Sequence, residues 1–317
     1  MEGENLEKIG INPSMKKMMI QATGFGTGAG KSFLVALLCR ILKEDGYKVA
    51  PFKALNLTGV TFLKDGREFG YSQVLQCQAA GIEPDWRTNP FTIKPKGNGL
   101  FDIILEGKCI KENYNPEKGF LFQVIKNIFT VDKEREKIKA KIKECFDNLS
   151  KEFDFIVIEG SGPVRIFGLG PFSSLLEIGN METAKMVNSP VILLSENVDS
   201  VPQTLSYLNQ EERRLIKGAI INKCPADDFL EIGIKEKWIN LGLKRLKKVY
   251  SKKIGLEILG ILPYFEETSQ LPDLDPIPSS ERVPLEKWQK ILPDLAQKTR
   301  RYLDLDRIYE ITSINFR

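Results

Sequence analysis

A glycine-rich turn near the start of this chain separates an apolar run from an amphipathic pattern. The apolar run covers residues 18–22, the turn GFGTGAGKS covers residues 24–32, and apolar residues recur at helical spacing from Ser32 to Leu42. Glycines allow a backbone to approach phosphate oxygens closely, so successive N–H groups and the helix N-terminus can face an anion. A strand, a turn and a helix in this order predict a phosphate-binding loop.

The last residues of the turn suit a nucleoside triphosphate. Lys31 would bring a positive charge to the outer phosphates, and Ser32 would offer a hydroxyl to magnesium. The pattern GxxxxGK[ST] fails at one position, because Phe25 stands where its first glycine is expected. A plain glycine-rich turn is the alternative interpretation. The residues predicted to bind the nucleotide here are Gly26, Thr27, Gly28, Ala29, Gly30, Lys31 and Ser32.

Strand-like and helix-like segments alternate along most of the chain. Short continuous apolar runs are typical of strands covered on both faces, and a helical pattern follows at 70–80 and again at 117–151. We therefore predict an α/β fold with a doubly wound, mainly parallel sheet of the P-loop NTPase type, with ligands at the carboxyl ends of the strands. The predicted strands include 18–22, 48–52, 101–105, 153–158, 191–194, 218–221 and 259–262.

Polar residues follow three of these apolar runs. Glu159 ends the run 153–158, where its carboxylate could hold magnesium directly or through water, or act only as a capping residue. Lys53 follows the run 48–52 and could equally be a solvated lysine. Asn222 precedes Lys223 after the run 218–221, and its amide could bind a purine edge or cap the next element.

Composition excludes several classes of chemistry. The sequence contains no histidine, which removes Ser/His and Cys/His nucleophiles and the usual zinc ligand sets. The net charge of +4 comes from interspersed charges and does not predict binding to nucleic acid. Five widely separated cysteines without a CxxC pair indicate reduced thiols. With no apolar stretch of membrane-spanning length and no signal-like start, we expect a cytoplasmic protein without a membrane partner.

We expect three regions along the chain. Residues 1–17 form a polar lead-in, and residues 18–271 form the ATP-binding domain. Residues 272–317 begin with a proline-rich connector and continue as a helical segment packed on the same domain.

Several segments resemble the amino-terminal synthetase domain of cobyric acid synthase. The resemblance covers residues 18–271 and implies a dethiobiotin synthetase-like P-loop fold with ATP and Mg²⁺ as cofactors. It also implies a reaction in which ATP phosphorylates the carboxylate of a small molecule, such as a corrinoid or another tetrapyrrole, and ammonia displaces the phosphate to leave an amide. The similar segments are MIQATGFGTGAGKS, GYKVAPFKALN, GREFGYSQVLQCQAAGIEP, NPFTIKPKG, FDFIVIEGSG, EIGNMETA, GAIINK and EILGILPY.

The same resemblance implies roles for individual residues. Lys31, Lys53 and Glu159 would be catalytic, with Lys53 steadying the substrate carboxylate or the charge that develops on transfer. The implied metal ligands are Ser32, Glu159 and Glu68, the implied substrate-binding residues are Lys53, Asn56, Gln73 and Gln76, and the implied base-binding turn is Asn222 with Lys223.

The chain also departs from the cobyric acid synthase pattern. Full-length members of that family carry a carboxyl-terminal glutaminase domain with a cysteine and a histidine, so we expect ammonia from a separate glutaminase or from solution. Residues 196–200 (ENVDS) replace an Asp-Arg-Gly-Gly segment, Gly28 replaces a polar residue, and Leu55 stands where PFKAQN has glutamine. We expect a homo-oligomer, a dimer.

Two other functions remain open. One is a nucleotide switch or accessory ATPase of the MinD or metal-insertion type, which carries a signature lysine two residues into the loop, where this chain has Gly26. The other is a dethiobiotin synthetase-like carboxylase, although the segment from PFKALN to KPKG favours cobyric acid synthase.

Overall fold

The structure is a computed structural model of the chain. It describes residues 15–24, 28–114, 128–165, 176–224, 239–268 and 285–313.

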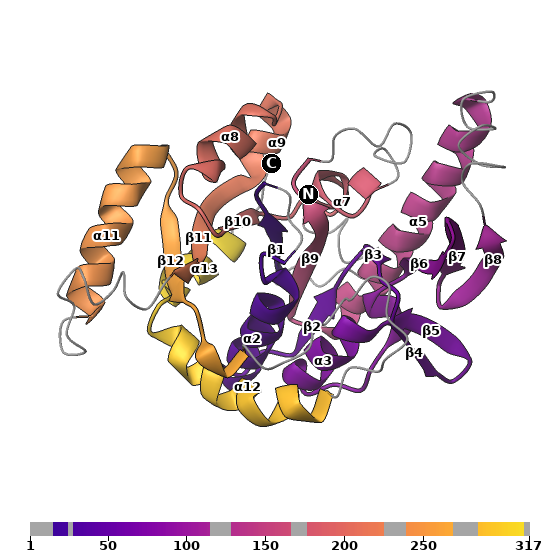
Figure 1. The fold of residues 1–317 in the computed structure, drawn as a ribbon, viewed down its shortest axis with the longest axis horizontal. Helices are drawn as coiled ribbons and strands as arrows, with labels where there is room; N and C mark the ends of the chain where they lie inside the picture. Colours follow the sequence, from indigo (N-terminus) through magenta and orange to yellow (C-terminus); the bar gives the residue numbers. More distant parts are fainter. Residues whose placement is uncertain are drawn as a thin grey trace, which may run out of the picture.

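Within these residues the centre of the fold is a six-stranded sheet whose neighbouring strands are all parallel (Figure 1). The predicted mainly parallel sheet is therefore confirmed. Six of the seven predicted strands fall on strands of this sheet. They were recognisable because a strand that is covered on both faces is a continuous apolar run. The strand order is β12 (Ile258–Pro263), β11 (Ile216–Cys224), β10 (Val191–Ser195), β1 (Lys16–Ala22), β9 (Phe155–Pro163) and β2 (Val49–Phe52).

Helices cover both faces of this sheet, as a doubly wound fold requires. Alternate strand residues point to opposite faces, so Met18 and Ile20 join one core and Met19 joins the other. The first core includes α2 (Lys31–Glu44), α3 (Tyr71–Ala80), α12 (Leu285–Arg300) and α13 (Leu305–Thr312). The second includes α5 (Ile128–Glu152), α7 (Met181–Met186), α8 (Ser200–Ser206), α9 (Gln210–Leu215) and α11 (Ile239–Ile254).

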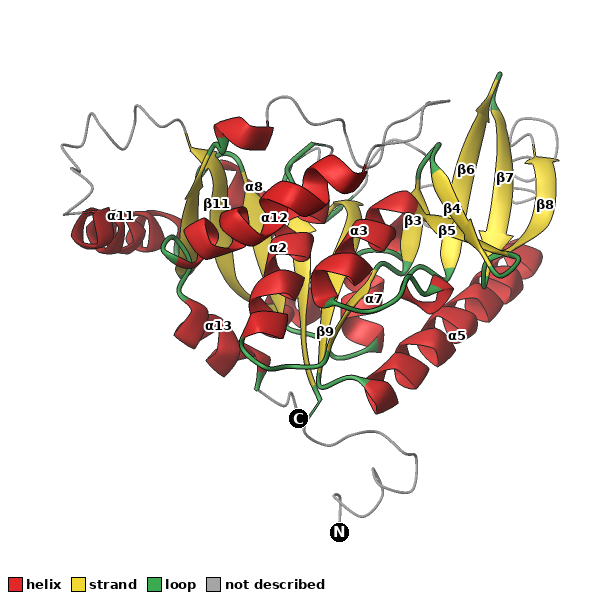
Figure 2. Ribbon diagram, turned by 90° about the horizontal axis from the view of Figure 1, so that it is seen from below, coloured by secondary structure: helices red, strands yellow, loops and turns green. Residues whose placement is uncertain are grey.

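A second, smaller sheet lies beyond the β2 edge, where Figure 2 shows it above α5. The predicted strand 101–105 belongs to this sheet as β7 and pairs antiparallel with both of its neighbours. A short hairpin of β4 (Thr61–Lys64) and β5 (Arg67–Gly70) lies beside it, and η1 (Trp86–Thr88) precedes β6. This second sheet was not predicted from the sequence. Its order is β3 (Leu55–Leu57), β6 (Phe91–Gly97), β7 (Leu100–Leu105) and β8 (Lys108–Tyr114).

The C-terminal helix α12 returns to the first helix of the fold. Trp288 of α12 packs against Phe33 of α2 with ring centroids 5.4 Å apart, and Leu292 and Leu295 are buried in the same core. Arg300, at the end of α12, donates to the carbonyl oxygen of Ile41 at 3.1 Å. Among the helices that the structure describes, none combines the length and apolarity needed to cross a bilayer.

Candidate functional site

The glycine-rich turn leads from β1 into α2, as the sequence predicts. Gly30 precedes the helix with a left-handed backbone (φ 88°), and Lys31 is the first helical residue. The Lys31 side chain is buried against the fold at 8% exposure. Gly26 and Thr27, both predicted to contact the nucleotide, lie outside the described residues. The described part of the turn places a helix N-terminus and a lysine at the carboxyl end of the central strand, where an anion is favoured.

Ser32 and Glu159 meet at this end of the sheet. Glu159 lies on β9 in register with Ile20 of β1, so its side chain emerges beside the turn that follows β1. The Ser32 hydroxyl donates to Glu159 Oε1 at 2.7 Å. Glu159 is only 1% exposed. A serine hydroxyl and a buried carboxylate in contact are oxygen donors of the kind that Mg²⁺ prefers.

Two further side chains contact the Glu159 carboxylate. Lys53 Nζ lies 2.7 Å from Oε1, and the Gln76 amide donates to Oε2 at 2.6 Å. Gln76 also donates to the carbonyl oxygen of Ser32 at 3.2 Å, which ties α3 to the start of α2. Lys53 is 5% exposed, so the ion pair is buried and each charge neutralises the other. The structure therefore brings together Ser32, Lys53, Gln76 and Glu159.

Buried amides extend from this cluster toward the second sheet. Asn56 of β3 donates to Gln73 of α3 at 3.2 Å, and Gln73 donates to Gln76 at 3.5 Å. Asn89, which the sequence analysis did not select, donates to the carbonyl oxygen of Lys53 at 2.9 Å and accepts from the Gly70 N–H at 2.8 Å. The predicted substrate side thus contains a hydrogen-bonded row of Asn56, Gln73 and Gln76, while Asn89 separately holds the backbone of Lys53.

Glu68 has different neighbours. Its carboxylate contacts the Thr61 hydroxyl and Lys94, which come from β4 and β6. Among the described residues no cluster of three or more histidine, cysteine or acidic side chains could hold a metal ion. Magnesium commonly uses one or two protein carboxylates together with water and substrate phosphates, so Ser32 and Glu159 fit that requirement. The assignment of Glu68 as a second metal ligand stays a prediction.

Asn222 and Lys223 hold the phosphate-binding turn from the side of β11. The Asn222 amide donates to the carbonyl oxygen of Ala29 at 2.8 Å, and Lys223 donates to that of Gly28 at 2.5 Å. Lys223 also pairs with Glu196 at 2.5 Å. Both predicted base-binding residues therefore have a structural contact with the turn, and their contact with a base stays a prediction.

Three hydroxyls form a cluster between β1 and β10 that the sequence analysis missed. Thr23 donates to Ser195 at 2.7 Å, and Ser200 lies 2.9 Å from Thr23 and 2.6 Å from Ser195. Ser195 directly precedes the segment 196–200 that replaces Asp-Arg-Gly-Gly, and Ser200 is the last residue of that segment. Threonine and serine are common residues, so their positions gave no signal until the strands were placed side by side.

Comparison with known proteins identifies the family. A family model described as CbiA, the CobQ/CobB/MinD/ParA nucleotide binding domain, matches residues 20–275, which include every side chain of the candidate site. The chain belongs to the CobQ/CobB/MinD/ParA nucleotide-binding family.

Curated relatives in this family carry the name cobyric acid synthase. The protein from Clostridium botulinum (strain Alaska E43 / Type E3) is 35% identical over 257 residues, which are 79% of this chain and 45% of the relative. The protein from Clostridium tetani (strain Massachusetts / E88) is 37% identical over 268 residues, 82% of this chain and 48% of the relative. The predicted resemblance to cobyric acid synthase is confirmed. The chain spans less than half the length of these relatives.

Solved structures also align with this member of the CobQ/CobB/MinD/ParA family. Cyanothece McdA in complex with ATP aligns over 96% of this chain and 98% of its own, with 14% identity and a TM-score of 0.41. Cobyrinic acid a,c-diamide synthase from Mycobacterium smegmatis, with bound ADP and magnesium, aligns over 90% of this chain and 98% of its own, with 14% identity and a TM-score of 0.34.

Gly30→Ala is expected to damage the turn more than Gly28→Ala. Both glycines have positive φ, 88° and 77°, where an alanine costs about 1–2 kcal/mol of stability. A Cβ at Gly30 would also lie 2.6 Å from the Asn222 amide nitrogen, whereas a Cβ at Gly28 would meet no atom within 4 Å. We expect a larger drop in melting temperature and weaker nucleotide binding for Gly30→Ala.

Comparison of Gly30→Ala with Gly28→Ala separates the stability cost of backbone strain from the cost of the clash with Asn222. Adding Asn222→Ala to Gly30→Ala should recover part of the lost melting temperature, because it removes the clashing amide. If the two glycine variants unfold at the same temperature, the Asn222 contact does not constrain the turn.

Proposed function

We propose that this chain binds ATP with Mg²⁺ and uses it to activate a substrate carboxylate for amidation. The observation that carries the proposal is the cluster of Ser32, Lys53 and Glu159 beside the phosphate-binding turn. Family membership and the similarity to proteins named cobyric acid synthase support it. A carboxylate is a poor electrophile with a poor leaving group, which is why activation must come before attack by an amine.

The proposed reaction has two steps. A substrate carboxylate oxygen attacks the γ-phosphorus of ATP, the bond to the β-phosphate oxygen breaks, and ADP leaves. Ammonia then attacks the acyl carbon, loses a proton, and displaces inorganic phosphate to leave an amide. Phosphoryl transfer of this kind depends mostly on positioning and charge neutralisation, which a fixed set of side chains can supply.

Each member of the cluster has a place in this scheme. Lys31 would neutralise charge on the outer phosphates, and Ser32 with Glu159 would hold Mg²⁺, which supplies further charge neutralisation at the phosphates. Lys53 would orient the substrate carboxylate toward ATP. Its buried amine already contacts a carboxylate, Glu159, at 2.7 Å, so the position is suited to a second acidic group.

The substrate and the ammonia source follow from the resemblance alone. We propose a small-molecule carboxylate, with a corrinoid or another tetrapyrrole as the first candidates, bound beside Asn56, Gln73 and Gln76. Ammonia would come from a separate glutaminase subunit or from solution. A homodimer and a cytoplasmic location stay predictions.

The decisive experiment incubates the purified chain with ATP, Mg²⁺ and ¹⁵N-ammonium against a panel of tetrapyrrole carboxylates. We expect a ¹⁵N-labelled amide by mass spectrometry, with one ADP released per amide formed. Omitting ATP or replacing it with a non-hydrolysable analogue should abolish the product. ATP hydrolysis without amide from any carboxylate in the panel would favour a MinD/ParA-type switch instead.

Ammonium, and not glutamine, is expected to support the reaction of this chain. The sequence has no histidine, so the cysteine and histidine pair of a glutaminase is absent from it. The measurement compares amide formation with the two nitrogen donors and follows glutamate release. Glutamate released by the purified chain would show that it hydrolyses glutamine and would contradict this expectation.

A further inference from the structure

One oxygen of the Glu159 carboxylate has two partners. Lys53 Nζ lies 2.7 Å from Oε1, and the Ser32 hydroxyl donates to the same oxygen at 2.7 Å. The other oxygen, Oε2, accepts from the Gln76 amide at 2.6 Å. Oε1 is therefore the oxygen on the Ser32 side, and an ammonium group already lies against it.

The same oxygen is the one that Ser32 and Glu159 would offer together to Mg²⁺, because their contact is made at Oε1. Lys53 would then lie beside a dication at a buried carboxylate. Two cations at such short range repel each other strongly where water is excluded. The ammonium of Lys53 and a bound metal ion are therefore alternative partners of Oε1.

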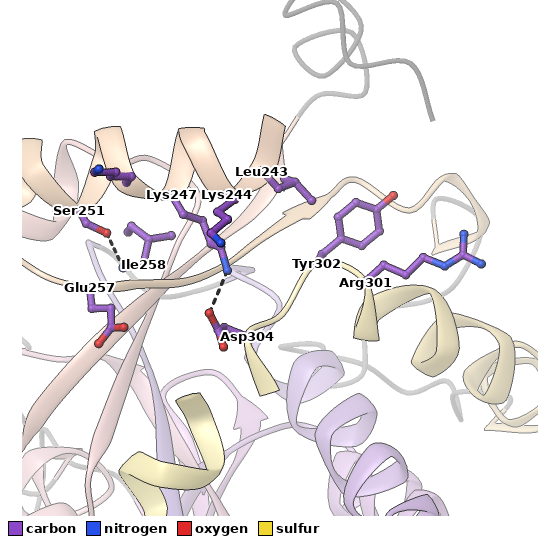
Figure 3. Close-up of a pocket in the computed structure, with 10 residues that line it drawn as sticks. Leu243, Lys244, Lys247, Ser251, Glu257, Ile258, Arg301, Tyr302 and Asp304 are labelled. Atoms are coloured by element: carbon purple, nitrogen blue, oxygen red, sulfur yellow. Dashed lines mark hydrogen bonds and ion pairs between the residues drawn. The ribbon is translucent and has the colours of Figure 1, made fainter. Parts of the chain in front are cut away.

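Burial makes these alternatives sharp. Lys53 is 5% exposed and Glu159 is 1% exposed, so water does not easily replace either partner. Another lysine pair is very different: Lys247 and Asp304 lie 3.3 Å apart in a pocket beside the amino end of β12, and the Asp304 side chain is 44% exposed (Figure 3). An ammonium that leaves Glu159 must meet another anion, whereas one that leaves Asp304 can meet water.

The backbone of Lys53 is fixed while its side chain can turn. The Lys53 N–H donates to the carbonyl oxygen of Thr88 at 2.7 Å, and the Lys53 carbonyl oxygen accepts from the Asn89 amide at 2.9 Å. The lysine stem has four carbons with rotatable bonds between them. The ammonium can thus move from one partner to another without a change in the backbone.

We propose that Lys53 exchanges carboxylate partners: it pairs with Glu159 when no metal is bound, and it becomes available to the substrate carboxylate when Mg²⁺ and nucleotide are bound. The inference rests on the proposed function, which assigns Mg²⁺ to Ser32 and Glu159. Bound Mg²⁺ supplies to Glu159 the positive charge that Lys53 supplies in its absence. Lys53 thereby sets an order of binding, in which the nucleotide and metal precede the substrate carboxylate.

The first test compares two crystal structures of the wild-type chain, one with ADP and Mg²⁺ and one with ADP and EDTA. We expect Lys53 Nζ to contact Glu159 Oε1 in EDTA and to lie beyond about 4 Å from it with Mg²⁺. The Lys247–Asp304 pair should be the same in both. Mg²⁺ bound at Ser32 with Lys53 still on Oε1 would overturn the exchange and leave the proposed function standing. Absence of Mg²⁺ from Ser32 and Glu159 would overturn both.

Calorimetry gives a second readout that needs no turnover. ADP affinity is measured in Mg²⁺ and in EDTA, and the ratio of the two reports the contribution of the metal. Lys53→Met removes the competing ammonium and keeps a long side chain, so we expect the ratio to rise by about tenfold or more. Lys247→Met removes the ammonium of the remote pair and should leave the ratio within about twofold. An equal ratio in the wild type and in Lys53→Met would overturn the exchange.

Melting temperatures add a control for folding. Lys53→Met leaves the Glu159 carboxylate without its cation, so the variant should melt below the wild type in EDTA. Addition of Mg²⁺ and ADP should then raise its melting temperature more than that of the wild type. A smaller rise than in the wild type would contradict the exchange. If the variant does not fold, the two wild-type structures decide the question alone.

Discussion

Replacing Lys31 by alanine is expected to reduce ATP affinity by about 100-fold or more, to the point where calorimetry detects no binding. Lys31 is the first residue of α2 and its side chain is largely buried, at 8% exposure, beside the turn that follows β1. Alanine removes the positive charge that this turn would bring to the outer phosphates. Alanine also favours a helix, so the variant should fold.

A control on the same helix isolates the effect of position. Lys43 is an exposed lysine in the last turn of α2, and Lys43→Ala should leave ATP affinity unchanged. Circular dichroism of both variants checks that the fold is retained. Wild-type ATP affinity in the Lys31→Ala variant would remove the main premise of the proposed function.

Glu159→Gln is expected to lower Mg²⁺-dependent turnover by about 10²–10³-fold while reducing ATP affinity much less. The amide keeps the size of the side chain and loses the negative charge that would hold the metal. It also removes the charge that lies 2.7 Å from Lys53 in a site where the carboxylate is 1% exposed. Kinetics as a function of Mg²⁺ concentration, with ATP binding measured in parallel, give the two effects separately.

The same substitution can destabilise the fold, because loss of one partner of a buried ion pair costs about 3–5 kcal/mol. The double variant Glu159→Gln with Lys53→Gln separates the two consequences. It should recover stability in a denaturant titration, because no unbalanced charge remains, and it should stay inactive. Glu152→Gln, which alters an exposed ion pair with Arg87, should behave as wild type. Full activity in the Glu159→Gln variant would contradict a metal-binding role.

The central fold could be predicted because its signals are local and strong. Apolar runs such as 153–158 and 191–194 are covered on both faces by helices, so they remain visible without any partner in view. The turn between β1 and α2 marks the middle of the sheet. The meeting of Ser32 with Glu159 then follows from topology, because β9 runs parallel to β1 as its neighbour.

The second sheet was missed for physical reasons. Strand β6 contains Pro95, and every residue of β8 from Lys108 to Asn113 is exposed, so neither strand shows an apolar run. The two-residue turns Asp65-Gly66 and Asn98-Gly99 do carry a hairpin signal, and all four residues adopt positive φ. Greater weight on those turns would have predicted the hairpins.

Side-chain partners from different layers could not be predicted. The contact between Gln76 and Glu159 depends on how α3 packs against the end of β9, which no local pattern encodes. The same is true of Asn89, whose amide reaches the backbone of Lys53 from a loop 36 residues away in sequence. Asn222 was selected as a base-binding residue, which stays a prediction, and its contact with the carbonyl oxygen of Ala29 was not predicted.

The return of α12 to α2 has a consequence for synthesis. The hydrophobic face of α2 around Phe33 meets Trp288, so a nascent chain leaving the ribosome exposes that face until the segment around residue 288 has also been translated. Folding of the first helix into its final surroundings is therefore a late event. During that interval the exposed surface is a natural substrate for chaperones.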